Sequence, residues 1–158
     1  MAEPFRFDAR ALRQGPVPKP AFRSRREVRF HEIDAAGIVF FARVLDYVHD
    51  HYTDFLASVG SPLPEVLAAR SWAAPIGHVE VDYFEPLRFG DELTLILAAA
   101  HVEGSRVTLA HQVLRHASSR VAAVAQTAHV FVSPEGFRPI PVPPALLARF
   151  QALPPAPG

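Results

Sequence analysis

The chain has 158 residues, 49% of them hydrophobic and 20% charged, which suits one substantial buried core rather than two. Sixteen basic and sixteen acidic side chains balance, so no overall field attracts nucleic acid or an anionic membrane. The sequence contains no cysteine, which excludes disulfides, thiolate metal sites and a cysteine nucleophile. The length therefore favours one domain. Because no apolar run reaches membrane length, we expect the protein to be cytoplasmic.

Proline marks the expected ends of the folded core. Four of the 16 prolines lie in residues 1–20 and eight lie in residues 134–158. Proline favours extended chain, so we expect a weakly ordered, passive N-terminal arm over residues 1–21 and a folded domain over residues 22–133. The tail over residues 134–158 should be extended as well, with a short amphipathic helix at residues 145–150.

One long helix is predicted over residues 42–59. Apolar residues recur there at steps of three and four, the period of a helix with one buried face. These residues are Val44, Val48, Tyr52, Phe55 and Val59. Gly60 and Pro62 follow and should end the helix.

The remaining apolar segments have the period of strands. Val79, Val81 and Tyr83 alternate with polar residues and should share one face. Turns that contain glycine or serine separate the later segments, which predicts an antiparallel meander. One long helix and about five strands indicate an α+β fold, a curved antiparallel sheet wrapped around the helix. The predicted strands are residues 27–31, 78–84, 92–101, 105–116 and 120–133.

Asp34 stands in the loop that leads into the predicted helix. The first backbone N–H groups of a helix have no partner within the helix. A loop carboxylate and these N–H groups could therefore approach the same carbonyl from two sides. The structural alternative is an aspartate that stabilises a turn or caps the helix.

Three segments of the chain have a pattern that can be compared with known families: residues 28–42, 78–86 and 89–91. They resemble the hotdog-fold acyl-CoA thioesterases of the 4-hydroxybenzoyl-CoA type, over about residues 26–132. A pattern in residues 48–52 and 75–78 is also similar to members that act on 1,4-dihydroxy-2-naphthoyl-CoA. The resemblance implies hydrolysis of an acyl-CoA thioester, with no cofactor beyond the coenzyme A of the substrate.

The resemblance implies catalytic roles for three positions. Asp34 takes the place of the family's carboxylate, which attacks the thioester carbonyl as a nucleophile or activates a water as a general base. Gly37 allows a tight turn, and the backbone N–H of Phe41 would face the thioester oxygen. Relatives often have Tyr or His where Phe41 stands, so no role is implied for its side chain.

Five further residues are candidates for binding the substrate. His49 and Tyr52 lie one helical turn apart and could contact an aryl group near Phe40. His78 could bond an acyl hydroxyl, and Arg88 could bind a phosphate of coenzyme A. The structural alternatives are core packing for Tyr52, an internal hydrogen bond for His78 and ordinary surface charge for Arg88. The aromatic residues favour an aromatic acyl group, and no histidine spacing suits a metal site.

The resemblance also implies an assembly. Members form homodimers with the site at the subunit boundary. Many of these dimers pair again into a dimer of dimers, a homotetramer, and exposed outer sheet faces would favour this second association. Asp46 and Asp50 are reserve carboxylates, because some hotdog thioesterases use an acid on the helix. An acyl-carrier-protein thioesterase, a hotdog dehydratase or hydratase, and a non-catalytic acyl-binding protein remain open alternatives.

Overall fold

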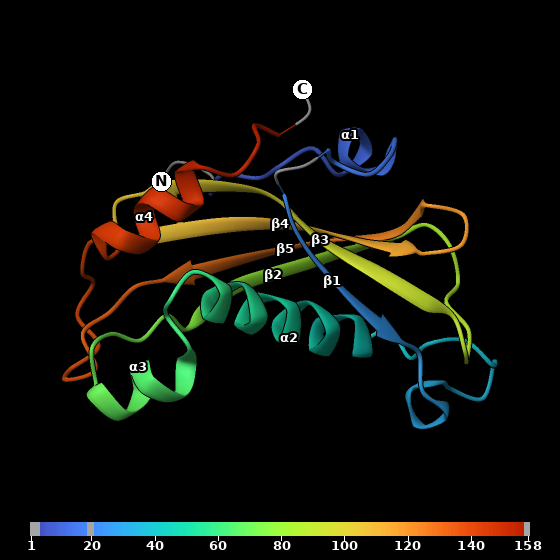
Figure 1. The fold of residues 1–158 in the computed structure, drawn as a ribbon, viewed down its shortest axis with the longest axis horizontal. Helices are drawn as coiled ribbons and strands as arrows, with labels where there is room; N and C mark the ends of the chain where they lie inside the picture. The colour runs from blue at the N-terminus through green and yellow to red at the C-terminus, as the bar shows by residue number, and fades with distance from the viewer. Residues whose placement is uncertain (1–3, 19–20, 157–158) are drawn as a thin grey trace.

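A five-stranded antiparallel sheet wraps around one long helix in the computed structural model, which describes residues 4–18 and 21–156 (Figure 1). The strand order is β1-β3-β4-β5-β2. The predicted α+β architecture is therefore confirmed. The strands are β1 (Phe22–Glu27), β2 (Ile76–Tyr83), β3 (Glu92–Glu103), β4 (Arg106–Arg115) and β5 (Arg120–Val130).

The predicted meander holds for only part of the sheet. Strands β3, β4 and β5 follow one another as neighbours, whereas β1 adds to the outside of β3 and β2 adds to the outside of β5. The order of the strands in space therefore departs from their order in the chain at both edges. These two edges are the parts of the sheet that can meet another chain.

The predicted strand at residues 27–31 was wrong. Strand β1 ends at Glu27, and Phe30–Glu32 form the 3-10 helix η1. The apolar spacing misled the prediction, because Val28 is fully buried while Phe30 is exposed. The true edge strand is rich in charged side chains, as edge strands often are, and it lacks an apolar alternation.

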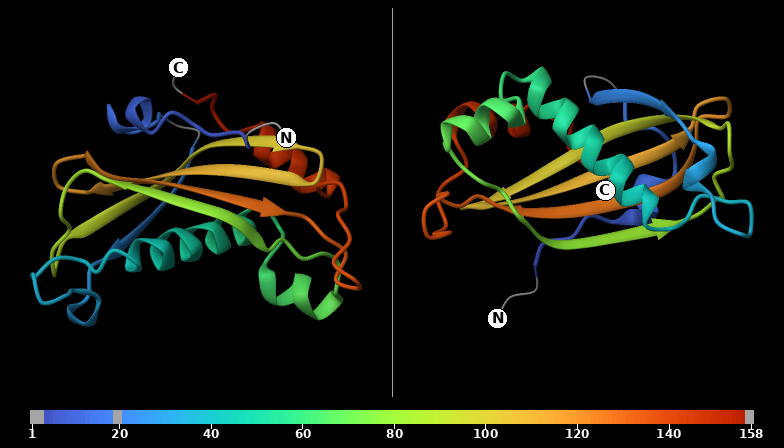
Figure 2. Two further views of the ribbon diagram at one scale, coloured as in Figure 1. Left: turned by 180° about the vertical axis from the view of Figure 1, so that it is seen from behind. Right: turned by 90° about the horizontal axis from the view of Figure 1, so that it is seen from below.

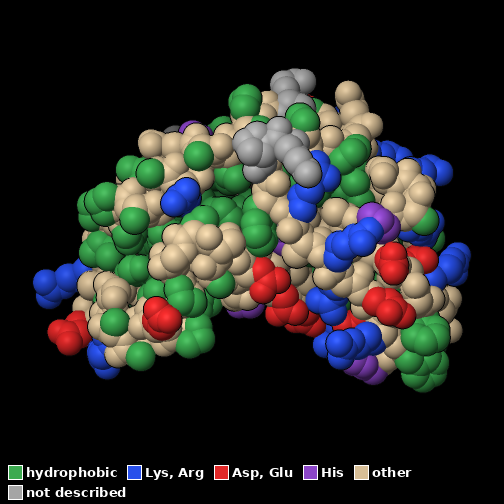
Figure 3. Space-filling model, viewed as in Figure 1, with side chains coloured by type: hydrophobic (Ala, Val, Ile, Leu, Met, Phe, Trp, Pro, Cys, Tyr) green, Lys and Arg blue, Asp and Glu red, His purple; other side chains and the backbone are tan. Residues whose placement is uncertain are grey.

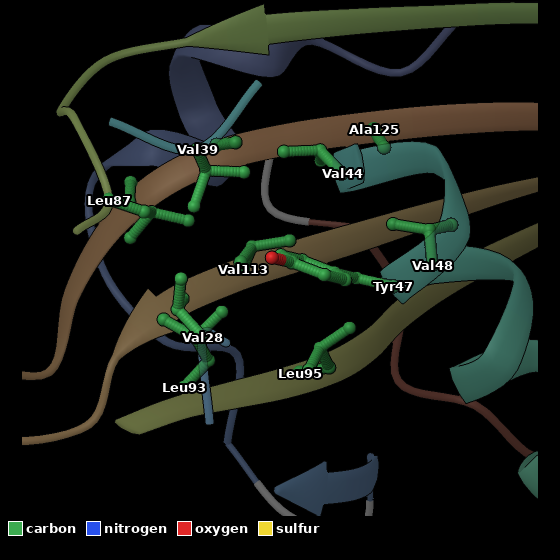
Figure 4. Packing of buried hydrophobic residues seen from close by; sticks show 12 residues of the cluster. Val28, Val39, Val44, Tyr47, Val48, Leu87, Leu93, Leu95, Val113 and Ala125 are labelled. Atoms are coloured by element: carbon green, nitrogen blue, oxygen red, sulfur yellow. The ribbon is translucent and has the colours of Figure 1, made fainter. Parts of the chain in front are cut away.

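Helix α2 (Arg43–Ser58) lies along the concave face of the sheet (Figure 2). Its predicted apolar face is buried, except that Val59 follows the helix and is half-buried. Tyr47, which is also buried, completes the packing against the sheet (Figure 4). The surrounding core residues include Val28, Val39, Val44, Leu93, Leu95 and Val113.

Two short helices lie near the C-terminal end of α2. Helix α3 (Leu63–Ala69) follows α2 directly, and α4 (Pro144–Gln151) lies where residues 145–150 were predicted to be helical. Phe150 of α4 packs against Phe55 of α2, with 5.7 Å between ring centroids. Among the described residues, no helix is both long and apolar enough to cross a membrane.

The N-terminal arm lies on the convex face of the sheet, opposite α2 (Figure 1). It contains helix α1 (Ala9–Arg13), which Asp8 caps by accepting hydrogen bonds from the first-turn N–H groups. This helix corrects the expectation of an extended, weakly ordered arm, because the proline pattern gave no sign of the sheet face that the arm covers. Residues 1–3, 19–20 and 157–158 of the predicted arm and tail lie outside the described part of the chain.

Candidate active site

Asp34 begins a tight loop between η1 and α2. Its backbone N–H donates to the carbonyl of Ile38 at 2.8 Å, and its own carbonyl accepts from the N–H of Gly37 at 3.0 Å. Ile33 and Val39 form an antiparallel bridge across the loop. Gly37 has a φ of 77°, a conformation that glycine adopts at little cost. The loop therefore contains the tight turn that Gly37 was predicted to allow.

The carboxylate of Asp34 is only partly used by the loop. Its Oδ1 accepts the N–H of Ala36 at 2.8 Å, whereas Oδ2 has no hydrogen-bond partner among the described residues. The side chain lines a cavity of about 440 Å³. Asp34 does not cap α2, since the N-cap residue is Ala42 and no side chain caps this helix. One carboxylate oxygen therefore remains available to a ligand.

The start of α2 supplies unused donors beside this carboxylate. The N–H of Phe40 donates to the carbonyl of Glu32, and the N–H of Arg43 donates to the carbonyl of Phe40. Between them, the N–H groups of Phe41 and Ala42 have no acceptor within residues 4–18 and 21–156. Such uncapped groups carry the positive partial charge of a helix N-terminus.

Apolar side chains form most of the cavity wall. Phe40 and Phe41 both line it, and the Phe41 side chain is 63% exposed. The hydroxyl of Tyr83 donates to the Phe41 carbonyl at 2.6 Å, and burial raises the pKa of Tyr83. Glu85 also lines the cavity, but its carboxylate pairs with Arg120 at 2.6 Å. Asp34 is thus the carboxylate of this cavity with an unengaged oxygen.

A buried carboxylate, Glu32, links the chain just before the Asp34 loop to β1 and α2 by hydrogen bonds. It accepts hydrogen bonds from the Tyr47 hydroxyl, the Arg29 N–H and the Arg26 guanidinium, each at 2.8 Å. Burial alone would raise the pKa of Glu32, but these donors outweigh burial and hold the pKa below its usual value. The sequence analysis missed Glu32. The available signal was an acidic residue two positions before Asp34.

His49 and Tyr52 do not line the Asp34 cavity. They line a second cavity, of about 470 Å³, with Trp72, Ile76 and other apolar residues at the far end of α2. Tyr52 is 4% exposed, and its hydroxyl has no partner among the described residues. Its ring lies 4.4 Å from that of His129, whose pKa burial lowers to about 4.

The two cavities lie at opposite ends of edge strand β2. Tyr83, the last residue of the strand, lines the Asp34 cavity. Ile76, the first residue of the strand, lines the cavity with His49 and Tyr52. One chain therefore brings together Asp34, Gly37, Phe40 and Phe41 but not the predicted aryl-binding pair.

His78 and Arg88 line neither cavity. His78 projects from the opposite face of β2 to Val81, and its Nε2 lies 3.3 Å from a carboxylate oxygen of Glu80. Arg88 lies in the turn before β3, where its backbone N–H donates to Asp91 at 2.8 Å. His78 thus has the internal partner that its structural alternative predicted.

The two reserve carboxylates lie on the solvent side of α2. Asp46 pairs with Arg43 at 3.0 Å and Asp50 pairs with Arg26 at 3.3 Å. Acidic and basic side chains gather over this helix in Figure 3. Neither aspartate lines the Asp34 cavity. No group of three or more His, Asp or Glu side chains in the described ranges could hold a metal ion.

Comparison with known proteins agrees with this architecture. Residues 28–150 match the family model of the thioesterase-like superfamily. A 1,4-dihydroxy-2-naphthoyl-CoA hydrolase of Thermosynechococcus vestitus is 31% identical over 137 residues, which is 87% of this chain and 93% of the relative. The corresponding hydrolase of Trichodesmium erythraeum is 35% identical over 116 residues, 73% of this chain and 84% of the relative.

A solved structure has the same fold. The 1,4-dihydroxy-2-naphthoyl-CoA thioesterase from Synechocystis aligns with a TM-score of 0.78 and 26% identity over 84% of this chain and 97% of that one. The sheet, its central helix and these neighbours define a hotdog-fold protein. The chain belongs to the thioesterase-like superfamily. The predicted fold, family and enzyme class, a thioesterase, are therefore confirmed.

Proposed function

We propose that this protein hydrolyses an aromatic acyl-CoA thioester to the free acid and coenzyme A, with Asp34 as the catalytic carboxylate. The observation that carries the proposal is the unengaged Oδ2 of Asp34 in a cavity at the start of an uncapped helix. The relatives at 31% and 35% identity are named as hydrolases of one aromatic acyl-CoA, which supports this substrate class.

The unused helix N–H groups suit the oxygen of the thioester. The negative charge that develops on this oxygen would be stabilised by the N–H of Phe41, next to that of Ala42. The bond from Arg43 to the Phe40 carbonyl holds the peptide that carries the Phe41 N–H. The bond from Tyr83 to the Phe41 carbonyl holds the next peptide. Both donors are thus oriented before a substrate arrives.

Asp34 has two chemically sound roles in the same position. As a nucleophile it would form a mixed anhydride and expel the thiolate of coenzyme A, and water would then hydrolyse the anhydride. As a general base it would take a proton from a water molecule that attacks the carbonyl carbon. Either role uses an ionised carboxylate and requires no metal ion or other cofactor.

We further propose a homodimer formed through the outer edge of β2, with which no strand of the described residues pairs. Ile76, Val79 and Tyr83 on this strand are 43%, 40% and 48% exposed, and the strand pairs with β5 on its other side. The opposite edge strand, β1, carries four charged residues in Phe22–Glu27, which discourages pairing there. An exposed apolar edge favours strand addition by a second copy.

Antiparallel pairing of two β2 strands would complete the site. The Tyr83 end of one strand would lie beside the Ile76 end of the other, because a two-fold axis reverses the direction. An acyl group bonded at Asp34 could then extend into the cavity of the other chain, toward the partner's His49 and the partner's Tyr52. The apolar, aromatic walls of that cavity suit an aryl group.

The alternatives receive less support from the site. A hotdog dehydratase or hydratase would need a histidine paired with the acid. No histidine of the described residues lines the Asp34 cavity, and in the proposed dimer the partner's His49 would lie toward the acyl group and not beside the carboxylate. An acyl-carrier-protein substrate would require the same thioester chemistry, so an assay with both kinds of ester is needed to distinguish it from an acyl-CoA substrate. The cytoplasmic location stays a prediction from composition.

The test is release of free thiol from a panel of esters. We expect rapid release from 1,4-dihydroxy-2-naphthoyl-CoA and 4-hydroxybenzoyl-CoA and slow release from hexanoyl-CoA. The same acyl groups on acyl carrier protein should react more slowly. No release from any ester would refute the proposal, and a preference for hexanoyl-CoA would refute the aromatic acyl class.

A further inference from the structure

The convex face of the sheet is an apolar surface that the chain covers with its own N-terminal arm. The arm runs over this face (Figure 2). Its side chains Phe7, Leu12 and Val17 are buried against the sheet. The side chains beneath the arm come from the three central strands and are almost fully buried. They include Ile96, Ala98, Ala110, Leu114, Val121 and Val124.

Two glutamines of the sheet hold the backbone of the arm. Gln126 of β5 accepts the Phe7 N–H at 2.8 Å and donates to the Phe7 carbonyl at 3.0 Å. Gln112 of β4 accepts the Val17 N–H at 2.9 Å and donates to the carbonyls of Leu12 and Gly15 at 2.6 and 2.7 Å. Buried amides need partners, and the arm supplies partners to both side chains.

Three contacts near the ends of the arm add to this attachment. Arg6 pairs with Glu80 at 2.8 Å, and the guanidinium of Arg13 lies 4.6 Å from the ring centre of Phe84. The Arg23 guanidinium donates to the carbonyl of Val17. The arm is therefore attached along its length and not at a single point.

The covered face would favour a second copy of the chain if it were free. An apolar patch of this kind promotes association in water, and two sheets pack well face to face. Each glutamine amide has both a donor and an acceptor, so two copies related by a two-fold axis could bond each other's amides.

We propose that residues 5–18 are a built-in cover over a self-association surface. With the arm in place, dimers cannot stack through their convex faces, so the dimer of dimers predicted from the sequence does not form there. With the arm released, two dimers meet through this face and the assembly doubles. The proposal rests on the packing of the arm and on the homodimer proposed above, and it is independent of the role proposed for Asp34.

The test compares the mass of full-length variants by sedimentation equilibrium. The wild-type protein should sediment at twice the chain mass of 17.4 kDa. The variant with Phe7→Ser and Leu12→Ser loses two apolar anchors of the arm and should sediment at four chain masses. A matched control with Phe30→Ser and Phe89→Ser loses two exposed aromatic rings elsewhere and should remain a dimer.

Trypsin cleavage after Arg10 or Arg13 reports whether the arm has left the sheet. The proposal is overturned if trypsin cleaves the arm of the Phe7→Ser, Leu12→Ser variant and this variant still sediments at the wild-type mass. It is equally overturned if the wild-type protein already sediments as four chains. It is also overturned if the double variant stays protected from trypsin, since apolar packing would then not hold the cover. Thioesterase activity is not used in either readout.

Discussion

The two cavities at the ends of β2 are similar in volume and both largely apolar, but they differ in the polar groups that they contain. The Asp34 cavity combines a carboxylate oxygen without a partner and the uncapped start of a helix. The cavity with Tyr52 is lined by aromatic and aliphatic side chains, and its buried His129 has a pKa lowered to about 4 by burial. The first is equipped for chemistry on a polar bond, and the second for binding an uncharged, flat group.

This difference explains why a single chain does not contain a complete site for an acyl-CoA substrate. The residues suited to reaction and those suited to recognition occupy opposite ends of one edge strand. A two-fold axis through that edge would bring one cavity of each kind together twice. The predictions below separate the two cavities by their different responses to substitution and pH.

The largest effect is expected for Asp34→Asn. We expect kcat to fall by about 10² to 10⁴-fold, because the amide can neither attack the carbonyl nor accept a proton from water. Thiol release measures the rate. Asp46→Asn, a change on the exposed side of α2, is the matched control and should keep wild-type activity. An active Asp34→Asn protein would remove the carboxylate from the mechanism.

Acid should destabilise the fold through three buried histidines, of which His129 lines the cavity with Tyr52. Burial lowers the pKa values of His51 and His129 to about 4 and holds that of His111 well below its usual value. Above pH 6.5 both folded and unfolded chains hold these groups neutral, so their stability contribution is complete. As pH falls from 6.5 toward 4, the unfolded chain binds protons that the folded chain does not, and stability is lost.

The loss should be on the order of 3 kcal/mol at pH 4 for each of His51 and His129. Urea unfolding at pH 7 and pH 4.5 measures this change. His129→Gln should flatten the pH dependence, whereas His31→Gln, at an exposed position, should leave it unaltered. A free energy of unfolding that is constant between these pH values would contradict the neutral, buried state of the three histidines.

Glu32→Gln should slow the reaction without a comparable change in KM. The variant keeps the shape of the side chain but weakens its bonds to Tyr47 and Arg26. A small displacement of Asp34 would follow, and we expect kcat to fall on the order of 10-fold. Steady-state kinetics separate kcat from KM, and circular dichroism checks the fold. Unchanged kcat would mean that Glu32 does not position the loop.

Tyr52→Phe should have the smallest effect and the most selective one. The lost hydroxyl has no partner among the described residues, so stability should not fall. The hydroxyl is fully buried, so it can bond a polar substituent of the acyl ring only where the substrate displaces neighbouring side chains. In that case kcat/KM should fall about 2 to 10-fold for 4-hydroxybenzoyl-CoA. The value for benzoyl-CoA should stay constant. Equal losses with both esters would contradict recognition by this cavity.

The sequence predicted the parts of the molecule that depend on local pattern. The bounds of α2, the loop at Asp34 and the turn at Gly37 depend on residues close together in the chain. Strand β1 was misplaced because its charged side chains give no apolar period. The role of Glu32 was missed because its partners, Arg26 and Tyr47, are identified only by the packing of three elements.

Long-range arrangement was the other gap. His49 and Tyr52 were predicted as a pair that could contact an aryl group, but helical spacing gave no distance between this pair and the loop of Asp34. The folded arm was missed for the same reason, since Gln112 and Gln126 meet it across about a hundred residues of chain.

Mixing two inactive variants tests most directly whether Asp34 acts on an acyl group held by the partner's cavity. Asp34→Asn removes the carboxylate, and His49→Trp fills the second cavity, so each homodimer should be inactive toward 4-hydroxybenzoyl-CoA. After subunit exchange, half of the dimers would pair an intact Asp34 with an intact second cavity at one of two sites, restoring about a quarter of wild-type activity. A mixture that stays inactive after mass spectrometry has verified exchange would contradict the shared site.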